Sequence, residues 1–147
     1  MKPPAISLRL VIPDDLPIFF EQQLDPVATQ MAAFPSRARE AFMAHWAKIM
    51  QDENVLLRTV LLDGQVAGSL VSFVIAGQRE VGYWYGRDFW GRGLATRALS
   101  AFLLVETRRP LHAYTAKHNT ASQRVLEKCA FKLQTEQEDW LVFKLEA

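Results

Sequence analysis

The chain has 147 residues, half of them hydrophobic, with 17 basic and 16 acidic side chains and a formal net charge of +1. This composition fits one globular domain, which at this length buries roughly 70% of its unfolded surface and needs no disulfide or metal to fold. The near-zero charge argues against a general nucleic-acid binder. The single cysteine, Cys129, excludes an internal disulfide, and the apolar runs are too short to span a bilayer.

The first half of the chain alternates helical and strand-like patterns. These patterns predict, in chain order, a strand at 6–12, a helix to about 23, a helix over 36–51, and strands at 55–62 and 65–74. Asp14 or Asp15 can cap the first helix, and Asp63 with Gly64 favours a hairpin turn between the two strands. Residues 26–35 carry a proline at each end and show no clear periodicity.

The second half predicts strands and helices in alternation. The patterns give a strand at 79–85, a helix over 93–107, a strand at 111–116, a helix over 121–129, and a hairpin of strands 132–136 and 140–145. Gly77 and Gln78 offer a turn before the first of these strands, and Pro110 ends the long helix. With no repeat or linker, the pattern predicts one α+β domain over residues 1–147 with a largely antiparallel sheet.

The most informative segment is the glycine-rich loop between the strand at 79–85 and the helix that follows. The first turn of a helix has unpaired N–H groups and the positive end of the helix dipole. Gly86, Gly91 and Gly93 let a bulky anion approach those groups. The loop therefore predicts a phosphate-binding site.

Two common nucleotide-binding motifs do not fit this loop. Gly86 and Gly91 have Walker A spacing, but Arg92 and Gly93 stand where that motif has Lys and Ser or Thr. A dinucleotide fingerprint would need Gly or Ala at Thr96, and it would need a βαβ unit in place of strands joined by hairpins.

A third motif fits better. The segment Trp90-Gly91-Arg92-Gly93-Leu94-Ala95 resembles the pyrophosphate loop of the GNAT acyltransferases, Gln/Arg-x-x-Gly-x-Gly/Ala, although Trp90 departs at the first position. That departure, and the upstream Glu80-Val81-Gly82-Tyr83-Trp84, resemble the branch related to ribosomal-protein N-terminal acetyltransferases. Residues 119–131 resemble the same branch's Asn-x-x-Ser-x-x-Val-Leu-Glu-Lys-x-Gly-Phe signature, with Ala130 in place of Gly.

The resemblance spans about residues 54–145 and implies the GNAT fold, with six to seven strands, about four helices and a splayed central strand pair. It implies acetyl-CoA as acyl donor and no metal, and the chain has no cluster with metal-ligand spacing. The implied cofactor-binding residues are Trp84, Tyr85, Trp90, Gly91, Arg92, Gly93, Leu94, Ala95, Thr96, Asn119 and Ser122. Asn119 can contact the pantetheine arm, cap the next helix, or do both.

The chemistry implied is acetyl transfer to an amine, which must first lose a proton. Glu80 is the candidate base, directly or through a water, and a backbone N–H near Tyr85 would stabilise the oxyanion. Leu126 stands where many GNAT enzymes carry a Tyr acid, which leaves Ser122, or Tyr114, to protonate the leaving thiolate. Glu80 can instead be a solvated strand-end charge, and Ser122 a hydroxyl that bonds to the helix start.

The sequence thus predicts an acetyl-CoA-dependent N-acetyltransferase. A primary amine, on a small molecule or a protein N-terminus, would attack the thioester directly in a ternary complex. Two other classes stay open: a non-catalytic acyl-CoA sensor, and an assembly module that uses the edge of its last hairpin. We expect no nucleic-acid or membrane partner, and a cytoplasmic location, because the first residues lack the apolar core of a signal peptide. A homodimer is usual in the family, but the sequence itself leaves the oligomeric state open.

Overall fold

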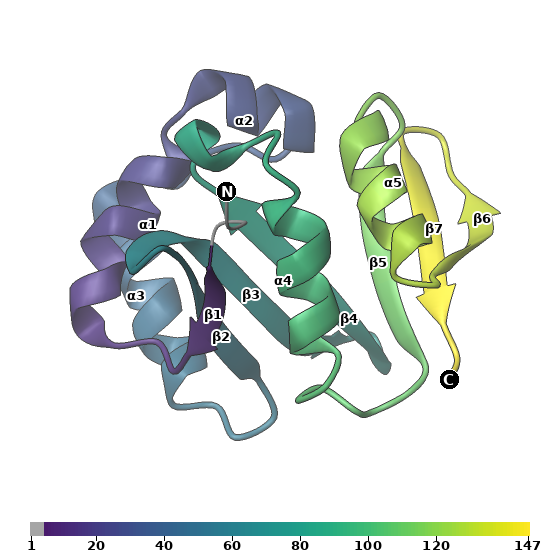
Figure 1. Ribbon diagram of the computed structural model, residues 1–147, viewed down its shortest axis with the longest axis horizontal. Helices are drawn as coiled ribbons and strands as arrows, with labels where there is room; N and C mark the ends of the chain where they lie inside the picture. Colours follow the sequence, from purple (N-terminus) through teal and green to yellow (C-terminus); the bar gives the residue numbers. More distant parts are fainter. Residues whose placement is uncertain (1–4) are drawn as a thin grey trace.

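One seven-stranded mixed sheet runs through the protein in the order β1-β2-β3-β4-β5-β7-β6 (Figure 1). The computed structural model describes residues 5–147. The strands are β1 (Ile6–Arg9), β2 (Leu56–Leu62), β3 (Gln65–Ile75), β4 (Gln78–Tyr85), β5 (Leu111–Ala116), β6 (Lys132–Glu136) and β7 (Trp140–Leu145). The α-helices are α1 (Leu16–Gln23), α2 (Pro26–Ala32), α3 (Arg39–Met50), α4 (Leu94–Phe102) and α5 (Thr120–Lys128), with short 3-10 turns η1 (Pro13–Asp15) and η2 (Arg87–Phe89).

The sheet is split between its two central strands, as predicted. Strands β1 to β4 form an antiparallel meander, and β5, β7 and β6 form a second antiparallel group. The groups join through parallel pairing of β4 with β5, which is confined to Glu80 opposite His112. Beyond this pair the two strands diverge, and Figure 1 shows them meeting at the lower end and separating toward the top. The α+β GNAT-type architecture expected from the sequence is confirmed.

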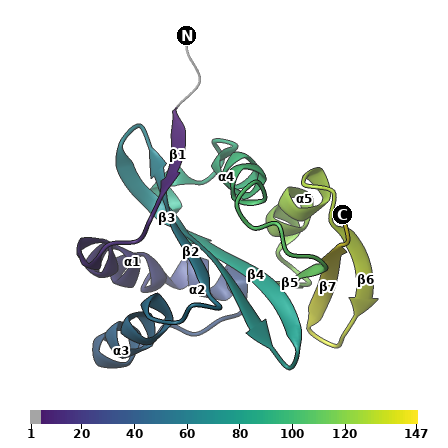
Figure 2. The ribbon, with the colours of Figure 1, turned by 90° about the horizontal axis from the view of Figure 1, so that it is seen from below.

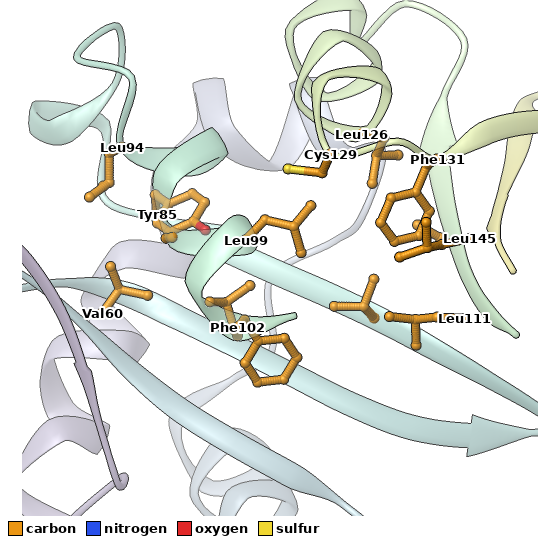
Figure 3. Packing of buried hydrophobic residues seen from close by; sticks show 14 of the residues in the cluster. Val60, Tyr85, Leu94, Leu99, Phe102, Leu111, Leu126, Cys129, Phe131 and Leu145 are labelled. Atoms are coloured by element: carbon orange, nitrogen blue, oxygen red, sulfur yellow. The ribbon is translucent and has the colours of Figure 1, made fainter. Parts of the chain in front are cut away.

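The helices lie on both faces of the sheet and bury two hydrophobic clusters. Helices α4 and α5 cover one face, while α1 and α3 cover the other face of the first strand group (Figure 2). Leu99 and Phe102 of α4 point into the larger cluster beside Leu111 of β5 and Leu126 of α5, all fully buried (Figure 3). The smaller cluster lies under α1 and α3 and is aromatic, with the Phe19 and Trp46 rings 5.0 Å apart.

Helix α2 is the main element that the sequence patterns missed, and it raises the number of α-helices within residues 5–147 to five. It fills the segment predicted to lack structure. Asp25 caps it by accepting a hydrogen bond from the Val27 N–H at 3.0 Å, and Pro26 occupies its first turn. Ala28 is its only buried residue, so an apolar stripe at helical spacing never develops.

The first helix is not capped as predicted, because Asp15 has another role. Its side chain is buried and accepts hydrogen bonds from Arg9 at 2.7 and 2.8 Å and from the Thr59 hydroxyl at 2.6 Å. It thereby ties β1 and β2 to the start of α1, and α1 begins without a side-chain cap. The predicted strand also ends early, at Arg9, where the chain turns toward this buried carboxylate.

Helix α4 ends at Phe102, five residues earlier than predicted. The next residues form tighter turns, with the Val105 N–H donating to the Phe102 carbonyl, and they bring Glu106 into the interior with 1% of its surface exposed. Burial alone would raise the pKa of Glu106, but hydrogen bonds from the Arg108 guanidinium at 2.9 and 2.8 Å and from Ser72 outweigh burial and lower the pKa to about 2. A buried carboxylate, rather than Pro110, fixes the end of the helix.

Replacing Glu106 with Gln should lower the free energy of unfolding at pH 7 by about 3 kcal/mol, because it leaves nearby guanidinium charge uncompensated. The ordinary pKa of 4.5 falls to about 2 in the fold, so the ionised side chain stabilises the protein above pH 4.5. That contribution is lost as the pH falls from 4.5 toward 2. Urea unfolding at several pH values should show the wild type and variant converging below pH 4.5, with exposed Glu127→Gln as control; a pH-independent difference would contradict this assignment.

Ala130 stands where the family signature has Gly, and its backbone adopts the left-handed conformation that favours Gly. The residue has a φ of +73° just after α5, where the Phe131 N–H donates to the Leu126 carbonyl and the Ala130 N–H to the Glu127 carbonyl. This is a Schellman turn, whose left-handed position favours Gly.

Replacing Ala130 with Gly should therefore stabilise the protein by about 1 kcal/mol, because the left-handed backbone strains a Cβ atom. The matched control is Ala44→Gly, an exposed site inside α3, where Gly should destabilise by about 0.5–1 kcal/mol. Denaturant unfolding measures both. Equal losses for the two variants would show that the φ of Ala130 carries no strain.

Candidate active site

A cleft of about 420 Å³ lies where β4 and β5 separate. It is bounded by the end of β4, the glycine-rich loop and start of α4, the start of α5, and α2. The lining residues are Ala28, Met31, Ala32, Tyr83, Trp84, Tyr85, Phe89, Trp90, Gly91, Gly93, Leu94, Ala95, Thr96, Asn119, Ala121, Ser122 and Val125. Of the cofactor-binding residues predicted from the sequence, all but Arg92, which is exposed, line this cleft.

The glycine-rich loop presents the first turn of α4 to the cleft. Gly91 and Gly93 have φ values of +77° and +71°, and no atom lies within 4 Å of the position a Cβ would take at either residue. The glycines are thus favoured by backbone conformation, and the space beside them is open. Gly93 caps α4 without a side-chain bond, so the N–H groups of Leu94 to Thr96 keep their capacity to bind an anion.

Two tryptophans fix the geometry of the loop and of β4. The Trp90 indole N–H donates to the Tyr85 carbonyl at 3.1 Å, which holds the loop against the strand that precedes it. The Trp84 indole N–H donates to the Gln22 carbonyl at 3.1 Å on the other face of the sheet. Both residues therefore have structural partners in addition to lining the cleft.

Gly68 allows β3 to lie close to the end of β4. A Cβ at this position would be 2.1 Å from the Trp84 carbonyl oxygen, and an extra residue in β3 next to Gly68 shifts the register with β2. A larger side chain would displace the strand that carries Tyr83 and Tyr85. This glycine belongs to the framework of the cleft, and the sequence motifs gave no sign of it.

Asn119 and Ser122 form the start of α5 on the second side of the cleft. The Asn119 side-chain oxygen accepts a hydrogen bond from the Ser122 N–H at 3.2 Å, so the capping role is confirmed. The Ser122 hydroxyl lies 2.7 Å from the Tyr83 hydroxyl, and this bond links α5 to β4 across the opening. Burial raises the pKa of Tyr83 to about 12, although the bond to Ser122 acts in the opposite direction.

Tyr85 stacks on Tyr83 with ring centroids 5.6 Å apart and is buried. Its hydroxyl makes no hydrogen bond within the described residues, and burial raises the pKa of this phenol well above its usual range. The phenol is therefore neutral, and its hydroxyl can donate or accept a hydrogen bond. The predicted role of Tyr85 rests on its backbone N–H, not on this side chain.

Helix α2 forms a third wall that the sequence motifs did not indicate. Ala28, Met31 and Ala32 line the cleft, and α2 is bound at both ends. The Arg87 guanidinium lies 3.1 Å from the Asp25 carboxylate, and the His118 Nε2 lies 2.8 Å from the Gln30 carbonyl oxygen. Small apolar side chains carry no motif, so only the three-dimensional arrangement identifies them.

Glu80 lies outside the lining of the cleft, at the point where β4 and β5 meet opposite His112. The side chain is partly buried, and that burial raises the pKa of its carboxyl group above the ordinary 4.5. A raised pKa makes a carboxylate a better proton acceptor. Tyr114, weighed as an acid, is exposed on β5, whereas Leu126 is fully buried in the core.

The arrangement defines a class of site. A helix N-terminus at one end, an apolar gap between diverging strands, and polar groups where the strands meet suit a long ligand with a phosphate group and a reactive tail. Within residues 5–147, no group of three His, Cys, Asp or Glu side chains is placed to hold a metal ion. No helix in the described part of the chain is long and apolar enough to cross a membrane.

The family follows from a comparison of sequences. The model of the acetyltransferase (GNAT) domain matches residues 6–132, so the chain belongs to the GNAT family of acetyltransferases. The resemblance stated from the two motifs is thereby confirmed. A comparison with curated proteins found no match.

Solved structures share the fold over nearly the whole chain. An acetyltransferase of the GNAT family from Bacillus anthracis is 18% identical with a TM-score of 0.81, covering 99% of this chain and 96% of that one. RimL, a ribosomal alpha-N-protein acetyltransferase in complex with coenzyme A, is 18% identical with a TM-score of 0.80 and coverages of 96% and 93%. An aminoglycoside acetyltransferase in complex with coenzyme A is 16% identical with a TM-score of 0.78 and coverages of 94% and 94%.

Proposed function

We propose that the protein transfers an acetyl group from acetyl-CoA to a primary amine, on a small molecule or a protein N-terminus. The observation that carries this proposal is the continuous cleft from the N-terminus of α4 to the opening between β4 and β5. The pyrophosphate would lie on the N–H groups of residues 91–96, and the pantetheine arm would run between the strands toward Asn119. The apolar lining and the open space beside Gly91 and Gly93 fit such a ligand.

The amine would attack the thioester carbonyl carbon within a ternary complex. Glu80, directly or through a water, would take the proton that the ammonium must lose, and its raised pKa supports this role. A backbone N–H near Tyr85 would stabilise the oxyanion of the tetrahedral intermediate. Collapse of the intermediate would break the carbon–sulfur bond, release the thiolate and leave the amide.

Ser122 would protonate the leaving thiolate. Many GNAT enzymes use a Tyr for this step at the position of Leu126, and here the contact between Ser122 and Tyr83 would provide a tyrosine proton instead. The two hydroxyls are 2.7 Å apart, both residues line the cleft, and the Tyr83 phenol stays protonated because its pKa is about 12. Tyr83 can therefore give its proton to Ser122 after the transfer, and a proton from solvent would then restore the phenol. The pair favours an enzyme over a non-catalytic sensor, which has no need of an acid at this position.

Replacing Ser122 with Ala should lower kcat about tenfold. A thiol with a pKa near 8.5 is a good leaving group, so the loss should be smaller than the 10²–10⁴-fold typical of general acids. Steady-state kinetics measure the effect, and Ser122→Thr, which keeps a hydroxyl, should restore most of the rate. An unchanged kcat in Ser122→Ala would remove this residue from the chemistry.

The decisive test of the function is an acetyl-CoA assay against a panel of amines, with thiol release as the readout. The panel should contain peptides with free N-termini, polyamines, amino sugars and amino acids. We expect amine-dependent thiol release with at least one class. Binding of acetyl-CoA with no turnover on any amine would favour the acyl-CoA sensor instead.

A further inference from the structure

A second cavity, of about 500 Å³, lies at the opposite end of β4 and β5 from the cleft. The start of β4 contributes Gln78 and Arg79, and the start of β5 contributes His112. Arg109, just before β5, and Lys144 of β7 complete its polar surface. It shares no lining residue with the cleft, so it is a separate site.

The lining of this cavity is basic. It includes Arg79, Arg108, Arg109, His112 and Lys144, and among the described residues no acidic side chain lines it. Two carboxylates pair with these cations: Glu106 lies 2.8 Å from Arg108 and 3.8 Å from Arg79, and the exposed Glu146 lies 3.0 Å from Lys144. Glu80, which lies opposite His112, is a third carboxylate beside this cavity, so four fixed cations against three carboxylates leave an excess of one positive charge.

Two polar atoms of this lining are buried and lack a partner among the described residues: Nε of Arg109 and Nδ1 of His112. His112 is 4% exposed, and a buried polar atom without a partner is costly. Arg109 is already held in place, because its Nη1 donates to the carbonyls of Glu106 and Arg108 at 2.7 and 3.0 Å. The fold thus supplies one prepositioned N–H donor, the Arg109 Nε, and one His112 ring nitrogen that donates when it carries a proton, and neither has a partner within the described chain.

We propose that this cavity binds a small anion through a carboxylate or phosphate group. Guanidinium groups recognise both anions through paired hydrogen bonds, and the cavity volume suits a small molecule. The anion can be a free metabolite or part of the amine acceptor. The second source is open because His112 lies opposite Glu80, so the proposed base and the cavity adjoin the same strand pair.

Histidine NMR tests the proposal directly, because the chain has three histidines, His45, His112 and His118, and only His112 lines the cavity. Phosphate and citrate are titrated into the protein with and without CoA. The informative variants are Lys144→Gln and Arg109→Gln, since a change at Arg108 would expose Glu106. The control is Lys48→Gln, which removes the same charge from the exposed side of α3.

We expect a saturable shift of the His112 signal in the wild type and in Lys48→Gln, and at least a tenfold weaker affinity in the two cavity variants. No saturable shift, or equal affinity in all variants, would overturn the proposal.

A second experiment, which rests on the proposed function, distinguishes the two sources of the anion: KM is compared for amines with and without an acid group. If the anion is part of the acceptor, amines with an acid group should have a lower KM than amines without one, and Lys144→Gln should abolish that difference. If the anion is a free metabolite, Lys144→Gln should leave the ratio of the two KM values unchanged. The NMR result does not depend on catalysis, so the failure of one proposal is distinguishable from the failure of the other.

Discussion

Replacing Glu80 with Gln is expected to lower kcat about 100-fold or more while the affinity for acetyl-CoA stays unchanged. The amide keeps the size of the side chain and cannot accept the proton of the attacking ammonium. Glu80 lies outside the lining of the cleft, so its loss should leave cofactor binding intact. The measurement is kcat with the best amine of the panel, beside calorimetry with acetyl-CoA.

The pH profile provides an independent check on Glu80. Burial raises the pKa of this carboxyl group above 4.5, so the ionised, active form is lost as the pH falls through that raised value. The wild type should show an acid limb there, and Glu80→Gln should lack it. Glu53→Gln, an exposed site before β2, is the matched control and should keep full rate. A full-rate Glu80→Gln enzyme with the same acid limb would exclude the residue as the base.

Replacing Gly93 with Asp is expected to weaken acetyl-CoA binding about 100-fold. It would place a negative charge at the N-terminus of α4, beside the N–H groups proposed to hold the pyrophosphate. Two like charges 4 Å apart repel by about 4 kcal/mol near a protein surface before salt screening. Asp is a favourable N-cap residue, so the helix itself should persist.

The neutral variant Gly93→Asn is the matched control for this charge. It has the same size and tolerates the left-handed conformation, which here has a φ of +71°. Its affinity should stay within about tenfold of the wild type. Equal losses for Asp and Asn would mean that backbone strain or bulk, and not charge, determines binding at this position.

The conformation of the glycine-rich loop could be predicted from the sequence because it depends on local residues. Closely spaced glycines before an amphipathic helix indicate exposed N–H groups at the helix start, and this depends on local sequence more than on tertiary contacts. Gly91 and Gly93 adopt the left-handed conformation that only Gly takes freely. The hairpin at Asp63 and Gly64 was predictable for the same reason, since both residues take positive φ values.

Features that depend on tertiary contacts could not be predicted from the pattern. Helix α2 buries a single residue, so its role as a wall of the cleft appears only when Ala28, Met31 and Ala32 come beside the glycine-rich loop. The early end of α4 depends on the buried Glu106, whose partner Ser72 lies far away in the sequence. The hydrophobic pattern of a segment therefore does not show contacts that its side chains make with residues far away in the sequence.

The basic cavity is a second feature that depends on tertiary contacts and could not be predicted from the sequence. The net charge of the whole chain is +1, and Arg87, Arg92 and Arg97 lie close to the glycine-rich loop in the sequence. In the structure Arg87 pairs with Asp25 and Arg92 is exposed outside the cleft. The basic residues of the cavity come from β4, from β5 and the segment just before it, and from β7, which come together only in the folded sheet.

Calorimetric titration of acetyl-CoA into the purified protein tests most directly whether the cleft between β4 and β5 holds acetyl-CoA, as proposed. We predict saturable binding of one molecule per chain, weakened about 100-fold in Gly93→Asp and retained in Glu80→Gln. Absence of saturable binding to the wild-type protein, or unchanged binding to Gly93→Asp, would contradict the proposal.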